Sequence, residues 1–187
     1  MKNKLLIALA VILLTGTLFA KSGFHIAYAL ENPGQANNNG FMLGWHTEPK
    51  LAKYIALDFH SNFAFSTFEN TRFSGGTDDV YHFHTMIMLG PKGFMTFGKL
   101  EPFVSIGGLF SFMAEYSDSN ADYFVGGGIF VKFGLDINFS KKFGIGFEIE
   151  YAKPWGKDYN TRTVLNPNDR ITNTIQDIMT FGIRLNY

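Results

Sequence analysis

The sequence has 187 residues, with 16 Lys or Arg against 16 Asp or Glu, 17% aromatic residues and no Cys. This length suits one domain, and the balanced charge, which includes no basic run, argues against a nucleic-acid partner. The missing Cys excludes a disulfide framework, a thiolate zinc site and a lipid-modified N-terminal cysteine.

The first segment of the chain is typical of a secretory signal peptide. Lys2 and Lys4 precede the uninterrupted apolar run Leu5–Leu14, and small residues lead to Ala20. The alternative is a membrane anchor helix, but the run is short for a bilayer core that needs about 20 apolar residues. We therefore predict that residues 1–20 are cleaved and that residues 21–187 form the mature domain.

The remainder of the chain alternates between apolar and polar residues with a period of two, which indicates β-strands. No long segment shows a helical period. The eight expected strands are Phe24–Leu30, Gly40–His46, Lys53–Phe65, Val80–Leu89, Phe103–Tyr116, Tyr123–Phe139, Phe143–Tyr151 and Thr174–Tyr187.

The two faces of each expected strand differ in size and polarity. In Phe143–Tyr151, for example, Phe, Ile and Tyr alternate with Gly and Glu. Eight such bulky faces would overfill the narrow interior of an eight-stranded barrel, whereas the small and charged faces would fit it. Turned outward, the aromatic faces make a lipid-facing belt, and closure satisfies the backbone groups that hydrocarbon cannot. We therefore predict an eight-stranded antiparallel up-and-down transmembrane β-barrel.

The expected connections alternate in length, as the turns and outer loops of such barrels do. Long polar loops are predicted at Glu31–Asn39, Ser66–Asp79, Ser117–Asp122 and Ala152–Asn173. Shorter turns fall at Thr47–Lys50 and Ser140–Lys142. Gly90–Pro102 is the exception, and a strand extension through Met95–Phe97 remains open there.

Two stretches resemble the small outer-membrane barrel family of OmpA-like, OmpX-like and OmpW-like proteins. Lys99–Gly108, KLEPFVSIGG, looks like the turn that opens the fifth strand in this family. Phe181–Tyr187, FGIRLNY, is similar to the C-terminal signal read by the barrel-assembly machinery, with Tyr187 in place of the usual Phe. The resemblance implies a bacterial outer-membrane location, lipid contact and that machinery as a partner. Family members include adhesins, stress proteins, narrow channels and lipid-modifying enzymes, so fold does not name function.

Several charged residues are expected to share the interior. This set is Lys132, Asp136, Glu148, Glu150 and Arg184. The turn at Ser140–Lys142 would bring Lys132 roughly opposite Glu150. A charged gate is one interpretation; a plug of paired charges is favoured, because small barrels leave no aqueous channel and unpaired buried charge is costly.

A second inward-facing group contains histidine. Its members are Asp58, His60, His82 and His84, with Asn62 nearby. A hairpin over Ser66–Asp79 would make His60 and His84 near neighbours. Two imidazoles and a carboxylate could bind a transition metal, but a hydrogen-bonding patch is the favoured interpretation, and we predict no metal and no cofactor.

Catalysis is not expected. A Ser–His pair must lie on one face to hydrogen-bond, and the adjacent residues His60 and Ser61 point to opposite faces of a strand. The sequence therefore predicts a non-enzymatic, monomeric barrel with a plugged lumen, acting through its loops in adhesion or envelope integrity. A narrow porin-like channel is the alternative. Candidate loop contacts are Trp155, Tyr159, Arg162 and Arg170.

Overall fold

A computed structural model of the chain describes residues 20–31, 39–70, 78–117, 120–140, 143–158 and 177–187. The predicted signal peptide lies outside these residues, apart from Ala20. Nine strands occur in this part of the chain. They are β1 (Lys21–Glu31), β2 (Asn39–Glu48), β3 (Lys50–Ala52), β4 (Ile55–Asn70), β5 (Asp78–Phe94), β6 (Leu100–Ser117), β7 (Asn120–Asn138), β8 (Gly144–Asp158) and β9 (Ile178–Asn186).

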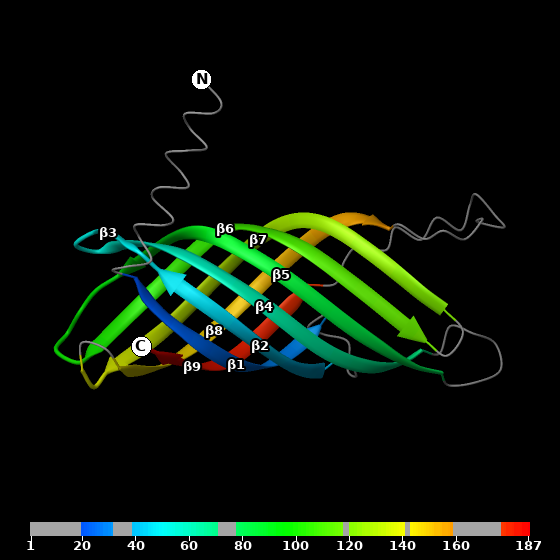
Figure 1. The fold of residues 1–187 in the computed structure, drawn as a ribbon, viewed down its shortest axis with the longest axis horizontal. Coiled ribbons are helices and arrows are strands. Elements are labelled where there is room, and N and C mark those ends of the chain that lie inside the picture. Colours follow the sequence, from blue (N-terminus) through cyan, green and yellow to red (C-terminus); the bar gives the residue numbers. More distant parts are fainter. Residues whose placement is uncertain (1–19, 32–38, 71–77, 118–119, 141–142, 159–176) are drawn as a thin grey trace, which may run out of the picture.

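Eight of these strands close into an antiparallel barrel, as predicted (Figure 1). Each strand pairs with its neighbours in the sequence, and β1 pairs with β9, for example His25 with Arg184. Because β2 pairs directly with β4, the short β3 is not one of the barrel strands. It pairs only with β4, at one end of the barrel. Closure leaves none of the eight barrel strands with an unpaired edge, which hydrocarbon requires.

The barrel has two distinct ends. We call the end that carries the connections 49–54, 95–99 and 139–143 the turn end, and the opposite end, with the other connections, the loop end. The start of β1 and the end of β9 meet at the turn end, where Ser22 and Tyr187 exchange backbone hydrogen bonds of 3.2 and 2.7 Å.

Several strands are longer than the sequence predicts, and the connections are correspondingly shorter. The predicted loop Ser66–Asp79 is partly strand, because β4 and β5 pair as far as Asn70 and Asp78. The predicted loop Ser117–Asp122 likewise reduces to two residues between β6 and β7. Polar residues remain in paired strands here because the ladder satisfies their backbone groups wherever it continues. At the turn end, β5 ends at Phe94 and β6 begins at Leu100. The strand extension through Met95–Phe97 that the sequence left open is therefore limited to an isolated bridge between Phe97 and Leu100.

The barrel is inverted relative to a soluble protein. Phe24 and Ile106 on the exterior are 57% and 59% exposed, whereas Asp136 and Arg184 in the interior are fully buried. An exterior of this kind is unfavourable in water and fits a lipid environment. Among the described residues there is no helix with the length and hydropathy needed to cross a membrane.

The β5–β6 ladder contains a close backbone contact that requires glycine. A Cβ atom on Gly107 would lie 2.2 Å from the Leu89 carbonyl oxygen and 2.6 Å from the Gly90 Cα. Both obstacles are backbone atoms, so neither can rotate away. The ladder is interrupted here, since regular pairing runs to Leu89 and resumes at Lys92.

We expect Gly107→Ala to lower the free energy of unfolding by about 1–3 kcal/mol, as overpacking does. Urea unfolding of the barrel in lipid vesicles measures the change. The matched control is Gly108→Ala, because a Cβ there meets nothing closer than the Gly128 carbonyl oxygen at 3.9 Å. Equal losses in the two variants would contradict the close-contact explanation.

Candidate functional site

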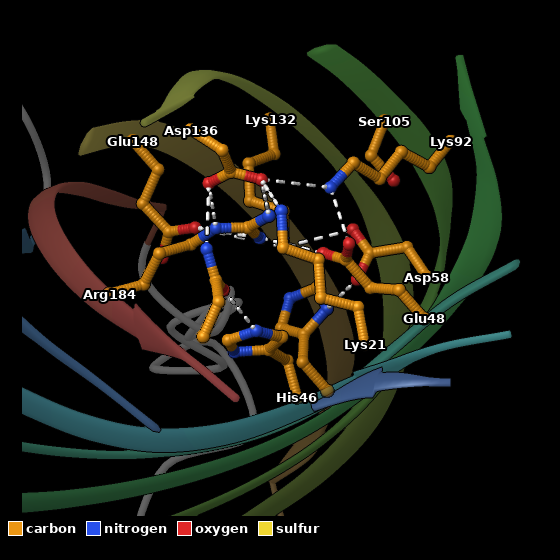
Figure 2. Close-up of polar contacts among 12 residues, drawn as sticks. Lys21, His46, Glu48, Asp58, Lys92, Ser105, Lys132, Asp136, Glu148 and Arg184 are labelled. Carbon is orange, nitrogen blue, oxygen red and sulfur yellow. Dashed lines mark hydrogen bonds and ion pairs between the residues drawn. The ribbon is translucent and has the colours of Figure 1, made fainter. Parts of the chain in front are cut away.

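The interior near the turn end holds a set of charged side chains, all of them buried except the partly exposed Lys21 (Figure 2). We call this set the luminal charge network. Its members are Lys21, Glu48, Asp58, His60, Lys92, Glu101, Lys132, Asp136, Glu148, Glu150 and Arg184. Each of the eight barrel strands contributes at least one of them. Successive side chains of a strand point to opposite faces, and these residues occupy the positions that face the lumen. All five interior charges proposed from the sequence belong to it.

Arg184 lies at the centre of the network. Its Nε and Nη2 donate hydrogen bonds of 2.7 and 2.6 Å to the two carboxylate oxygens of Asp136, and its Nη1 donates one of 2.7 Å to Glu48. The guanidinium also lies 4.3 Å from the centre of the Phe103 ring. This fork geometry joins β9 to β7 and β2, and only arginine provides it.

Two lysines extend the contacts of Arg184 toward the turn end. Lys92 Nζ lies 2.5 Å from Glu48, 3.7 Å from Asp136 and 3.9 Å above the Phe103 ring. Lys21 Nζ lies 2.6 Å from Asp136 and 3.2 Å from Glu101. Asp136 therefore has three cations around it.

A second group of contacts lies deeper in the barrel, on the side of the Arg184 contacts that faces the loop end. Lys132 Nζ is 2.9 Å from Asp58. The His60 ring nitrogens contact Asp58 at 3.3 Å and Glu150 at 2.9 Å, and Asn62 donates to Glu150 at 3.1 Å. Lys132 pairs with Glu150 in the β7–β8 ladder, as predicted. Its nearest carboxylate, however, is Asp58, because the lysine chain reaches across the lumen.

Carboxylates outnumber permanent cations in the network. Glu48, Asp58, Glu101, Asp136, Glu148 and Glu150 face Lys21, Lys92, Lys132 and Arg184. Glu148 makes no hydrogen bond, and its contacts with His25, Lys132 and Arg184 are all 3.7–4.0 Å long. The arrangement can hold charge out of water by mutual pairing, and Glu148 is its least tightly held member.

A layer of apolar side chains crosses the interior on the loop side of the charge network. We call it the apolar layer; it consists of Ala27, Ala29, Met42, Ala64, Met86, Met88, Leu109, Phe130, Ala152 and Ile178. Phe130 joins the two regions, since its ring meets the His60 ring edge-on at 5.1 Å. The interior is therefore not uniformly polar, contrary to the expectation from the sequence.

The structure separates the predicted histidine cluster. His60 pairs with Met88, and His84 pairs with Ala64, four residues farther along β4. The predicted proximity of His60 and His84 is therefore wrong, because β4 extends five residues beyond its expected end at Phe65 and β5 only two before its expected start at Val80, which shifts the register by three residues. His60 instead lies 6.5 Å from the His25 ring. Within the described residues, no three His, Asp or Glu side chains are arranged to hold a metal ion.

His82 and His84 lie on the loop side of His60, and His84 pairs with Ala64 of the apolar layer. His84 Nε2 forms a hydrogen bond with the Ser111 hydroxyl on the next strand, a cross-strand pair that the sequence analysis did not consider. The side chains of His84 and Ser111 are both fully buried. The pair is enclosed by the barrel wall, and we assign it to packing.

Several members of the luminal charge network were missed from the sequence. Glu48 and Lys92 lie just beyond the predicted ends of their strands, and Lys21 and Glu101 just before the predicted starts. Continuing the alternation from His46 to Glu48 would have found the first of these. Lys92 lies in the connection Gly90–Pro102, which the sequence left open, and the preceding Pro91 is in an exposed position.

The proposed loop contacts are only partly visible. Trp155 is not a loop residue: β8 continues to Asp158, and Trp155 pairs with Gly127 on the barrel exterior, 50% exposed. Tyr159, Arg162 and Arg170 lie outside the described residues.

Comparison with solved structures supports the fold. No protein-family model matches the sequence, and no curated protein matches it. The chain is similar in structure to a major outer membrane protein from Thermus thermophilus, with a TM-score of 0.54, 10% identity, and 89% of this chain and 99% of that chain covered. It is also similar to Neisserial surface protein A, with a TM-score of 0.53, 10% identity, and 90% and 96% covered. The chain thus has the fold of the small outer-membrane β-barrels.

Proposed function

We propose that this protein is a non-enzymatic barrel of the bacterial outer membrane whose lumen is plugged and whose surface loops act in adhesion or envelope integrity. The observation that carries the proposal is that two barriers lie in series inside the barrel. An ion that enters at the turn end meets the luminal charge network, and beyond it the apolar layer, where it would lose its hydration without replacement.

The plug is also consistent with the contacts themselves. Arg184, Lys132 and Lys92 each bind carboxylates on other strands, so opening a path would break several buried ion pairs at once. Breaking a buried pair costs about 3–5 kcal/mol, which disfavours spontaneous opening. The burial of the His84–Ser111 pair supports the absence of catalysis, because a nucleophile must reach its substrate.

The alternative is a narrow channel for small solutes. The excess of carboxylates over permanent cations and the weakly held Glu148 favour it, since both would attract a cation into the lumen. The apolar layer opposes it, because the described part of the layer contains Met, Leu, Phe, Ile and Ala side chains that cannot replace a hydration shell.

We expect the folded barrel to show no steady conductance in a planar lipid bilayer, and Lys132→Ala to leave this unchanged because the apolar layer stays in place. The channel alternative predicts steady conductance that Lys132→Ala alters, whereas the exterior variant Lys153→Ala does not. Heat-dependent electrophoretic mobility confirms that each sample is folded. Conductance in the unaltered barrel would overturn the plug.

The partners follow from the same proposal. Membrane lipid surrounds the exterior, and the C-terminal strand ending in Tyr187 is recognised by the barrel-assembly machinery during insertion. Residues 1–20 direct export and are removed. The barrel is a monomer with no nucleic-acid partner, and Tyr159, Arg162 and Arg170 remain proposed contacts for an external partner.

A further inference from the structure

The connections at the turn end are joined into one continuous rim. The backbone N–H of Phe94 donates to the Tyr54 carbonyl at 3.0 Å, which ties the first connection to β5. The N–H of Asn138 donates to the Lys99 carbonyl at 2.8 Å, which ties the second connection to β7. We call the described residues 49–54, 95–99, 139–140 and 143 the turn rim. Its parts are held in a fixed relation by these bonds and by the ladders beneath them.

Positive and negative side chains are separated at the turn end: lysines lie on the turn rim, and carboxylates lie in the lumen. Lys50, Lys53 and Lys99 are exposed on the rim. The connections 49–54, 95–99 and 139–143 contain no Asp or Glu in their sequence. The Asp and Glu side chains nearest this end are those of Glu48, Glu101 and Asp136.

These carboxylates cannot neutralise the rim lysines. Glu48 and Asp136 point into the lumen, where Lys92 and Arg184 bind them, and Glu101 contacts Lys21. The nearest acids are thus paired with other cations and removed from solvent. Within the described residues, the rim presents positive charge alone.

The rim lysines also stand among exposed apolar side chains. The exposed set is Leu51, Tyr54, Met95, Phe97, Phe139 and Phe143. Lys53 Nζ lies 4.8 Å above the exposed Tyr54 ring. An exposed aromatic ring with an ammonium group beside it is typical of the boundary between hydrocarbon and headgroups. Lys50 Nζ lies 5.0 Å above the Phe94 ring, which is buried in the interior. The rim is continuous with the apolar exterior that contacts lipid.

We propose that the turn rim binds the phosphate groups of anionic phospholipids, with Lys50, Lys53 and Lys99 as the cationic contacts. Each lysine near an anionic membrane surface contributes on the order of a fivefold preference. The aromatic neighbours fix the depth of the rim at the headgroups, so the lysines meet phosphate rather than water or acyl chains. This proposal does not depend on whether the lumen conducts.

The two tryptophans allow a local test. Trp45 lies on β2 near the turn end, and Trp155 lies on β8 near the loop end. Trp155→Phe and Trp45→Phe each leave one reporter. Both barrels are reconstituted in phosphatidylcholine vesicles that contain a minor fraction of brominated phosphatidylglycerol, which quenches tryptophan on contact. Brominated phosphatidylcholine at the same fraction corrects for differences in lipid access.

We expect quenching of Trp45 by the anionic lipid to exceed the phosphatidylcholine reference about twofold, and quenching of Trp155 to match it. The triple variant Lys50→Gln, Lys53→Gln, Lys99→Gln should bring Trp45 to the reference value, as should roughly 1 M salt, which screens surface charge. Lys153→Gln, on the exposed lysine near the loop end, should change nothing. Equal quenching at both reporters, or enrichment that survives in the folded triple variant, would overturn the proposal.

Discussion

Replacing Arg184 with alanine is expected to lower the free energy of unfolding by about 3–5 kcal/mol. The guanidinium holds Asp136 through two hydrogen bonds and Glu48 through a third, all at 2.6–2.7 Å. Without it, these two buried carboxylates lose all three hydrogen bonds and keep only their contacts with Lys21 and Lys92. Urea unfolding in lipid vesicles, followed by tryptophan fluorescence, measures the loss.

Two further variants separate geometry from charge. Arg184→Lys restores the positive charge but not the fork, so we expect it to recover only part of the loss. Lys153→Ala removes an exposed cation whose partner, Asp177, lies 3.7 Å away, and its effect should stay below about 1 kcal/mol. An Arg184→Ala barrel as stable as Lys153→Ala would show that the network is not held by pairing.

Replacing Phe130 with alanine is expected to cost about 3–5 kcal/mol. This side chain is 1% exposed and fills the apolar layer beside the His60 ring. Its removal leaves a cavity that the closed barrel wall cannot collapse to fill. Unfolding in urea is again the measurement, and Phe130→Leu should recover much of the loss by restoring volume.

Phe133 provides the control on the same strand. It faces outward and is 56% exposed, so lipid chains can occupy the space that Phe133→Ala vacates. We therefore expect a smaller loss than for Phe130→Ala. Equal losses would mean that the apolar layer is not packed more tightly than the exterior.

The alternation of residues was sufficient to predict the barrel and to orient most of its side chains. Asp58, His60 and Glu150 were assigned to the interior because each follows the phase of small or polar neighbours. Phe130 was not assigned to either face. Its position has the phase of the inward face, which was recognised by small and polar residues, and a large aromatic residue does not fit that description. Polarity alone cannot identify an apolar layer inside an inverted barrel.

Strand ends and register were less predictable. Glu48 and Lys92 fell outside the expected strands because they lie in the connections Thr47–Lys50 and Gly90–Pro102 that the sequence indicated. The pairing of His84 with Ala64 depends on where the hairpin loop is centred in the sequence. A polar loop and a polar strand extension have similar compositions, so sequence does not show where each strand ends, and unequal extension of the two strands changes which residues pair between them.

The position of Arg184 on β9 has a consequence for the order of assembly. Arg184 binds carboxylates on β2 and β7, and β9 is the strand whose pairing with β1 closes the sheet. The contact of Arg184 with Asp136 lies within β7, β8 and β9, which pair with one another without the β1–β9 seam. Its contact with Glu48, and the contact of Lys21 with Asp136, join strands on opposite sides of that seam. These two ion pairs can therefore form only when the last seam closes, so part of the neutralisation of the interior waits for closure.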